Sequence, residues 1–150
     1  MAIAKREQVL ARLFDVLATV NGVESTVRNR GLLGEDARPA LVQLDGDETN
    51  VLPGPVGQPR MAPALVRMQP QIFIVLKNAK PQNKDVGPTL NQFRALIIRA
   101  IATDAQLLAL LGSNGKMSYD GCETDLKTGM LVEGQMQLNF SLTCVLDPYK

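Results

Sequence analysis

The chain has 150 residues, a length typical of one domain, so we expect a single domain over residues 1–150. Sixteen Lys and Arg residues nearly balance fifteen Asp and Glu residues, and the net charge of +1 argues against a generic nucleic-acid-binding protein. The sequence has no His, which removes Ser–His and Cys–His catalysis and most zinc chemistry. We therefore expect that the protein is not an enzyme.

The first predicted element is an amphipathic helix over residues 5–20. Apolar side chains recur there with the 3.6-residue period of a helix, namely Val9, Leu10, Leu13, Phe14, Leu17 and Val20. We expect Asn21-Gly22 to end this helix, because Gly readily takes the left-handed conformation of a C-terminal cap. An Asn-Gly pair also occurs in hairpin turns, but the preceding helix favours the cap.

Two strands are expected next, over residues 23–30 and 39–44. Asp45-Gly46-Asp47-Glu48 has the composition of a turn and should end the second strand. Residues 46–63 are rich in Pro and Gly and have no apolar period, which predicts a long loop. Loops of this length in a compact domain are usually functional or disordered.

The middle of the chain predicts two more strands, another loop and a helix. The strands cover residues 64–68 and 71–77, and the second is apolar on both faces, which indicates that both faces are covered. A polar loop is expected over 78–88, followed by a helix over 89–102 with an apolar stripe.

A short helix and the most regular strand pattern of the chain come after this. Thr103 and Gln106 fit a capping box that opens the short helix, and Gly112 closes it. Strands are expected over 116–124 and 135–146. The second alternates apolar residues with uncharged polar ones, which are Gln135, Gln137, Asn139, Ser141 and Thr143.

The order of these elements predicts an α+β fold, in which helices pack on one face of a mainly antiparallel β-sheet. The uncharged polar face of the last strand is typical of a surface that meets another subunit, because free surface strands usually carry Lys or Glu. No apolar run approaches the roughly 20 residues of a membrane span, and the N-terminal segment lacks a signal-peptide core, so we expect neither.

Cys122 and Cys144 are too far apart in the sequence for a CxxC redox or zinc pair. They could form one disulfide if they lie on adjacent strands. We favour two buried thiols that behave as small apolar side chains.

The charged clusters give no specific ligand site. Asp45, Asp47 and Glu48 lack the oxygen spacing of a calcium loop, and Gly54-x-x-Gly57 lacks the Lys-Ser/Thr of a phosphate loop. Positive charge gathers in the first half without the interleaved aromatic residues of a nucleic-acid surface. Scattered surface or interface Arg is the better interpretation of Arg28, Arg30, Arg38, Arg60 and Arg67.

Several short segments occur in an order that is familiar from one group of proteins. They are Asn21-Gly22-Val23, Val27-Arg28-Asn29-Arg30, the strand at 39–44 with its acidic run, Met68-Gln69-Pro70, Leu90-Asn91-Gln92-Phe93-Arg94, Asp104-Ala105-Gln106-Leu107, Leu110-Leu111-Gly112 and the segment 114–121 before the long last strand. With this ordered set the chain resembles the tail terminator proteins of bacteriophages, also called tail-completion or minor tail proteins.

The resemblance implies an α+β subunit that assembles into a homo-oligomeric ring, usually a hexamer. Such a ring caps the tail tube, ends its polymerisation and joins it to the head connector, or stopper, protein. Genomic DNA passes through the lumen without sequence-specific binding. The implied location is the tail–neck junction of the virion, after assembly in the host cytoplasm. The family has no catalytic residues and no cofactor to transfer.

In such a ring, long polar loops would contact the tube and the connector. We therefore expect docking loops at 46–63 and 78–88, and the candidate docking residues are Pro53, Pro55, Arg60, Lys80 and Lys84. The candidates for the intersubunit or lumen surface are Arg28, Arg30, Asp45, Asp47 and Glu48. The alternatives are another phage neck or tube protein and, less favoured, a small-ligand-binding domain.

Overall fold

The computed structural model describes residues 3–31, 34–52, 59–76, 85–125 and 134–150. Its five strands form one sheet in the order β1-β2-β3-β5-β4. All neighbouring strands are antiparallel except β1 and β2, which run parallel. The strands are β1 (Ser25–Arg28), β2 (Ala40–Leu52), β3 (Ala64–Val75), β4 (Lys116–Asp125) and β5 (Gln135–Leu146).

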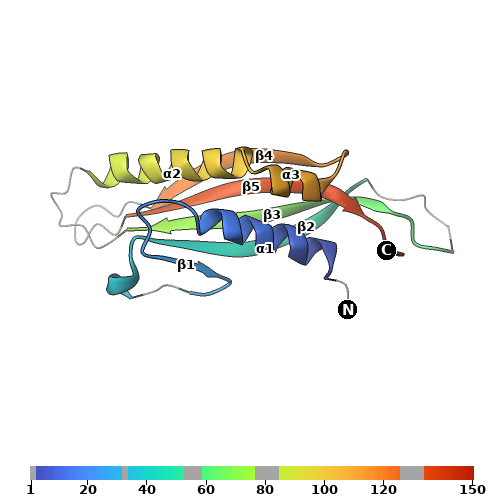
Figure 1. The fold of residues 1–150 in the computed structure, drawn as a ribbon, viewed down its shortest axis with the longest axis horizontal. Coiled ribbons are helices and arrows are strands. Elements are labelled where there is room, and N and C mark those ends of the chain that lie inside the picture. Colours follow the sequence, from blue (N-terminus) through green and yellow to red (C-terminus); the bar gives the residue numbers. More distant parts are fainter. Residues whose placement is uncertain (1–2, 32–33, 53–58, 77–84, 126–133) are drawn as a thin grey trace.

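Three α-helices pack on one face of this sheet (Figure 1). They are α1 (Lys5–Leu17), α2 (Val86–Ala102) and α3 (Ala105–Leu111), and a short 3-10 turn, η1 (Glu35–Ala37), lies between β1 and β2. The structure confirms the predicted α+β class, with a mainly antiparallel sheet and helices on one face.

The core lies between the helices and the sheet. Even-numbered residues of β3 and β5 point into it, because successive side chains of a strand alternate between faces. The helices contribute side chains at helical spacing. The large, fully buried side chains include Leu10, Leu13, Leu17, Met68, Ile72, Ile74, Leu90, Ile97, Leu107, Leu138 and Leu142.

The first helix is shorter than predicted. It ends at Leu17 with Ala18 as its cap, and Gly22, with φ +87°, lies in the turn that follows rather than at the cap. The apolar period continues to Val20 because Val20 packs against the core from this turn. The second helix begins earlier than predicted, at Val86, so it includes part of the expected loop 78–88.

The predicted loop at 46–63 is wrong over its first part, because β2 continues through the acidic run to Leu52. Leu44 pairs with Gln71 and Asp47 with Gln69, so two residues of β2 lie opposite Pro70. This is a β-bulge, and Gly46 fits it with φ +73°. Pairing with β3 therefore outweighs the turn preference of Asp45-Gly46-Asp47-Glu48.

The same bulge explains why the two strands expected at 64–68 and 71–77 are one continuous strand. Proline cannot donate a backbone hydrogen bond and is tolerated in strands at bulges. Pro70 lies opposite the bulge of β2, where the regular register is interrupted. β3 therefore runs without a break from Ala64 to Val75.

The capping box is also assigned differently in the structure. The N-terminal cap of α3 is Asp104, whose Oδ2 accepts a hydrogen bond of 2.8 Å from the Leu107 backbone N–H. The Thr103 hydroxyl instead donates to the carbonyl of Arg99, 2.8 Å away, at the end of α2. Gly112, with φ +81°, ends α3 as predicted.

The sheet face opposite the helices, here called the open face, is not covered by any helix of the described chain (Figure 1). Its β3 and β5 positions are odd-numbered, from Leu65 to Val75 and from Gln135 to Val145. The prediction that both faces of β3 are covered holds only in part, since Val75 is buried there whereas Phe73 is half-buried.

Candidate functional site

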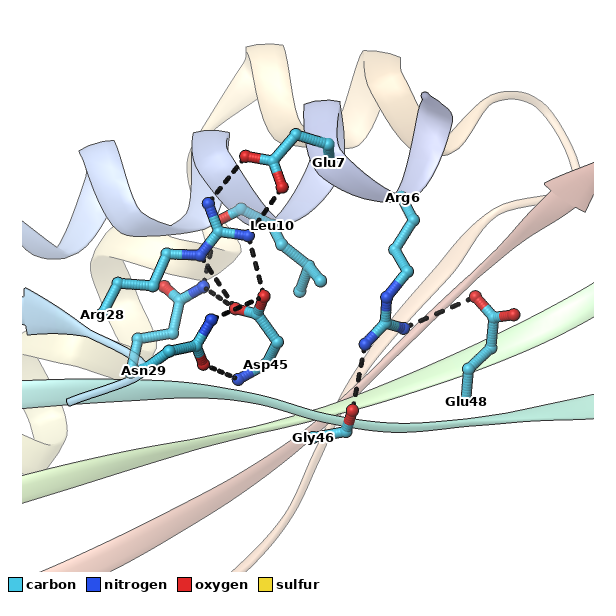
Figure 2. A network of polar contacts seen from close by, with 9 residues as sticks. Arg6, Glu7, Leu10, Arg28, Asn29, Asp45, Gly46 and Glu48 are labelled. Carbon is cyan, nitrogen blue, oxygen red and sulfur yellow. Dashed lines mark hydrogen bonds and ion pairs between the residues drawn. The ribbon is translucent and has the colours of Figure 1, made fainter. Parts of the chain in front are cut away.

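Arg28, the last residue of β1, points toward α1 and lies between two carboxylates (Figure 2). Its Nε and Nη2 donate to the Asp45 carboxylate at 2.9 and 2.8 Å. Its Nη1 and Nη2 donate to the Glu7 carboxylate at 2.8 and 2.9 Å. Planar guanidinium groups favour such paired contacts, and here one joins α1, β1 and β2.

Two amide side chains complete the environment of Asp45. Asn29, with φ +53°, donates from Nδ2 to the carboxylate at 3.0 Å and accepts from the Asp45 backbone N–H at 3.0 Å. Gln43, fully buried, donates from Nε2 to Asp45 at 3.3 Å and to the Leu10 carbonyl in α1 at 3.0 Å. The first half of β2 is thereby fixed to α1.

These contacts set the electrostatics of the cluster. Burial pushes the pKa of Asp45 upward, but hydrogen bonds from Arg28, Asn29 and Gln43 outweigh it and leave the pKa below its ordinary value. The hydrogen bond from Arg28 also lowers the pKa of Glu7. The pKa of Arg28 is raised, first by Asp45 and then by Glu7, so the cluster is held in its charged form at neutral pH.

A second arginine, Arg6 of α1, contacts the bulge of β2 (Figure 2). Arg6 donates from Nη2 to the Gly46 carbonyl at 3.0 Å, and its Nη1 lies 3.5 Å from a carboxylate oxygen of Glu48. Three of the predicted interface residues, Arg28, Asp45 and Glu48, therefore have partners within the chain. Their assignment to an intersubunit or lumen surface stays a prediction.

The other two predicted interface residues lie elsewhere. Asp47 is exposed and lies opposite Gln69, on the open face. Arg30 is exposed and lines a small apolar hollow of about 190 Å³ at the β1–β2 side of the same face. The other residues of this hollow are Gly31, Val42, Leu44, Phe73, Val75 and Gln135.

A larger, polar hollow of about 420 Å³ lies farther across the open face. Three acidic residues line it, Asp47, Asp120 and Glu123. Asp120 accepts hydrogen bonds from the hydroxyls of Ser118, at 2.8 Å, and Ser141. The remaining lining residues are Gly46, Gln69, Pro70, Gln71, Gln137, Asn139 and Phe140. We call this hollow the acidic hollow.

Of the candidate docking residues, only Arg60 lies within the described residues. It is exposed, just before β3, and the next residue, Met61, accepts a 2.7 Å hydrogen bond through its carbonyl from the Tyr149 hydroxyl. Pro53, Pro55, Lys80 and Lys84 lie outside the described residues, as does most of the expected loop at 78–88.

Other polar contacts could not be found from the sequence. Arg12 of α1 makes two hydrogen bonds to Asp104, at 2.9 and 2.6 Å, across 92 residues of chain. Arg94 of α2 donates to the Tyr119 hydroxyl at 2.9 Å. No local pattern marks these pairs, because sequence periodicity identifies a buried face but not which charged side chains meet across it.

The described residues contain no group of three or more Cys, Asp or Glu side chains placed to hold a metal ion. Cys122 and Cys144 are both free, and Cys122 is exposed, which corrects the expectation that both thiols are buried. Burial raises the pKa of the Cys144 thiol.

The comparisons with known proteins add no assignment, since no protein-family model and no curated protein matches the chain. None of the described helices has both the length and the apolar composition needed to cross a membrane.

Proposed function

We propose that this chain is a structural virion protein of the tail terminator type, not an enzyme. Copies assemble into a ring, six in the usual form, that caps the tail tube, stops its polymerisation and joins it to the head connector, while genomic DNA passes through the lumen. The observation that supports this best is the open face.

The open face has the composition of a surface that another protein covers. β5, between β3 and β4, contributes amides and hydroxyls to this face, of which Ser141 and Thr143 are already buried within the subunit. The half-buried Phe73 of β3 belongs to the apolar hollow, and polar and charged side chains such as Arg67 lie elsewhere on the same face. An apolar patch rimmed by polar residues marks a protein–protein contact more often than a solvated surface.

The charge of the chain also fits a ring that conducts DNA without holding it. The net charge is only +1, which gives the subunit little overall attraction for phosphate groups. Self-assembly into a closed ring needs different surfaces of one subunit to meet, and a subunit with helices on one side and an open sheet on the other offers such a pair.

The first test is the solution mass by light scattering over a concentration series, with negative-stain images of each species. A hexamer would have a mass of about 98 kDa, six times the 16.3 kDa of the chain. The second test adds purified tail tubes and counts capped ends. We expect rings with a central hole that bind tube ends and prevent further growth.

Two results would contradict the proposal in different ways. Long filaments formed by this protein alone would favour a tube protein. A protein that neither forms rings nor caps tubes at any concentration would overturn the terminator assignment, and a tightly bound small ligand on such a monomer would favour a ligand-binding domain.

A further inference from the structure

The outer surface of α2 carries positive charge and apolar area without any acid. The helix contains Arg94 and Arg99 but no Asp or Glu. Arg94 is half-buried and donates a hydrogen bond to the Tyr119 hydroxyl, whereas Arg99 is exposed and makes no ion pair with a described residue. Leu96, one turn before Arg99, is 42% exposed. We call the exposed residues of this surface the α2 stripe, and they are Asn91, Gln92, Ala95, Leu96 and Arg99.

The open face, on the other side of the subunit, carries Arg67 and Lys116 in the row of Thr143, while its acidic residues gather at the acidic hollow. Asp47, Asp120 and Glu123 line the acidic hollow, and among the described residues none of them has a Lys or Arg partner. Glu123 is exposed on β4, one of the two edge strands of the described sheet. An unpaired cation on one side and unpaired carboxylates on the other are complementary surfaces.

The positions of the apolar and charged groups also correspond. Phe73 pairs with Gln137, and Gln137 pairs with Glu123, so the three lie in one row across β3, β5 and β4. Strands are spaced by about 4.8 Å, which places Phe73 and Glu123 about 10 Å apart. Leu96 and Arg99 are neighbours on one side of α2, with about 5–6 Å between their Cβ atoms. The long Arg99 side chain can cover the remaining distance to a carboxylate about 10 Å from Phe73.

We propose that the α2 stripe of one copy seats on the open face of the next, with Leu96 against Phe73 and Arg99 paired with Glu123. This inference rests on the proposed ring and names the contact that builds it. The two surfaces lie on opposite sides of the subunit, so the contact is heterologous and copies join head to tail. The ring closes when successive rotations sum to a full turn.

The test reverses each charge separately. Arg99→Glu and Glu123→Arg should each weaken self-association at least tenfold, measured as the concentration at which rings dissociate. The double variant restores the pair with opposite polarity and should form rings again. Mixing the two single variants in equal amounts should also restore rings, because every contact in an alternating ring then joins opposite charges.

Matched controls separate this contact from a general effect of charge. Asp15→Arg on the exposed side of α1 and Lys150→Glu at the C-terminal end make the same charge changes outside both surfaces and should leave the ring mass unchanged. Leu96→Ser removes apolar contact without changing charge and should also weaken the ring. Thermal unfolding followed by circular dichroism shows whether each variant is folded.

The outcomes distinguish the two proposals. Wild-type rings that survive both single reversals, or single variants that are not restored by mixing, would overturn this contact and leave the terminator function standing, with the open face turned toward another partner. A wild-type protein that is monomeric at every concentration overturns the contact as well, and tube capping then decides the function separately.

Discussion

Arg28 of β1 connects three elements, because its side chain contacts Glu7 of α1 and Asp45 of β2. Its guanidinium is 20% exposed and has two carboxylate partners, one on α1 and one on β2. Hydrogen bonds between charged groups are stronger than neutral ones when water is partly excluded, while exposed ion pairs contribute little. The Asp45 side chain is only 20% exposed, so its contact with Arg28 is the stronger one. The Glu7 side chain is 51% exposed, so its ion pair with Arg28 contributes little.

The substitution Arg28→Gln should lower the free energy of unfolding by about 1–2 kcal/mol, most of it from the Asp45 side of the contact. Arg30→Gln is the matched control, since Arg30 is exposed and has no ion pair with a described residue. It should change stability by less than about 0.5 kcal/mol. Urea unfolding at pH 7 measures both, and equal losses would contradict the role of Arg28.

The same cluster predicts how stability depends on pH. The pKa of Asp45 lies below its ordinary 3.8 in the folded protein, so the unfolded chain binds a proton more readily. The stabilisation is complete above the ordinary value and is lost as pH falls through the folded value. Stability should therefore drop steeply in the acid range below about pH 4.

Asp45→Asn tests this pH dependence, because it removes the titrating carboxylate and keeps a side chain of similar shape. The variant should be less stable at pH 7, and its stability should fall less steeply between pH 5 and pH 3 than that of the wild type. Urea unfolding at several pH values gives the slope. An unchanged slope would mean that other carboxylates, such as Asp104, determine acid unfolding.

Gly46 is required by the bulge of β2 for two reasons. Its φ is +73°, and a Cβ at this position would lie 2.0 Å from the Gln69 carbonyl oxygen of β3. Gly46→Ala should therefore cost more than about 2 kcal/mol in the free energy of unfolding. Gly121 also has a positive φ, but a Cβ there would meet no atom within 4 Å. Gly121→Ala should therefore lower the free energy of unfolding only through backbone strain. Equal losses would show that the clash is relieved.

At the scale of elements, Asp104 connects the start of α3 to α1. Its carboxylate caps α3 through the Leu107 N–H and accepts from Arg12, whose hydrogen bond is the main cause of its lowered pKa. Asp104→Ala should destabilise the protein by about 1–2 kcal/mol, the typical effect of losing a cap. Thr103→Ala, at the residue expected as cap from the sequence, should cost less than about 0.5 kcal/mol.

The helices and the last strand could be predicted from local patterns, whereas the full lengths of β2 and β3 could not. Strict alternation in β5 and the 3.6-residue period in α1 and α2 record burial on one face. The turn-like run after Leu44 and the Pro at position 70 predicted breaks, because each is unfavourable in an isolated strand. In the sheet the two irregularities lie opposite each other and form one bulge.

At the scale of the whole molecule, the segment between β2 and β3 is the candidate for contact with the tail tube. Because β2 ends at Leu52, a deletion that spares the strand begins after that residue. A chain that lacks residues 54–58 should form rings with the same number of subunits that no longer cap tubes. Counting capped tube ends by negative-stain microscopy checks this, and normal capping would assign tube contact to another surface.

The sequence by itself determined the fold class, the helices, the alternating last strand, and the exclusion of His-based catalysis, because each depends only on composition or on local periodicity. The tertiary structure decided that the strands extend through the acidic run and that Arg28 lies between Glu7 and Asp45. These features arise when residues far apart in the chain meet, and pairing and burial then outweigh the local preferences of the residues involved.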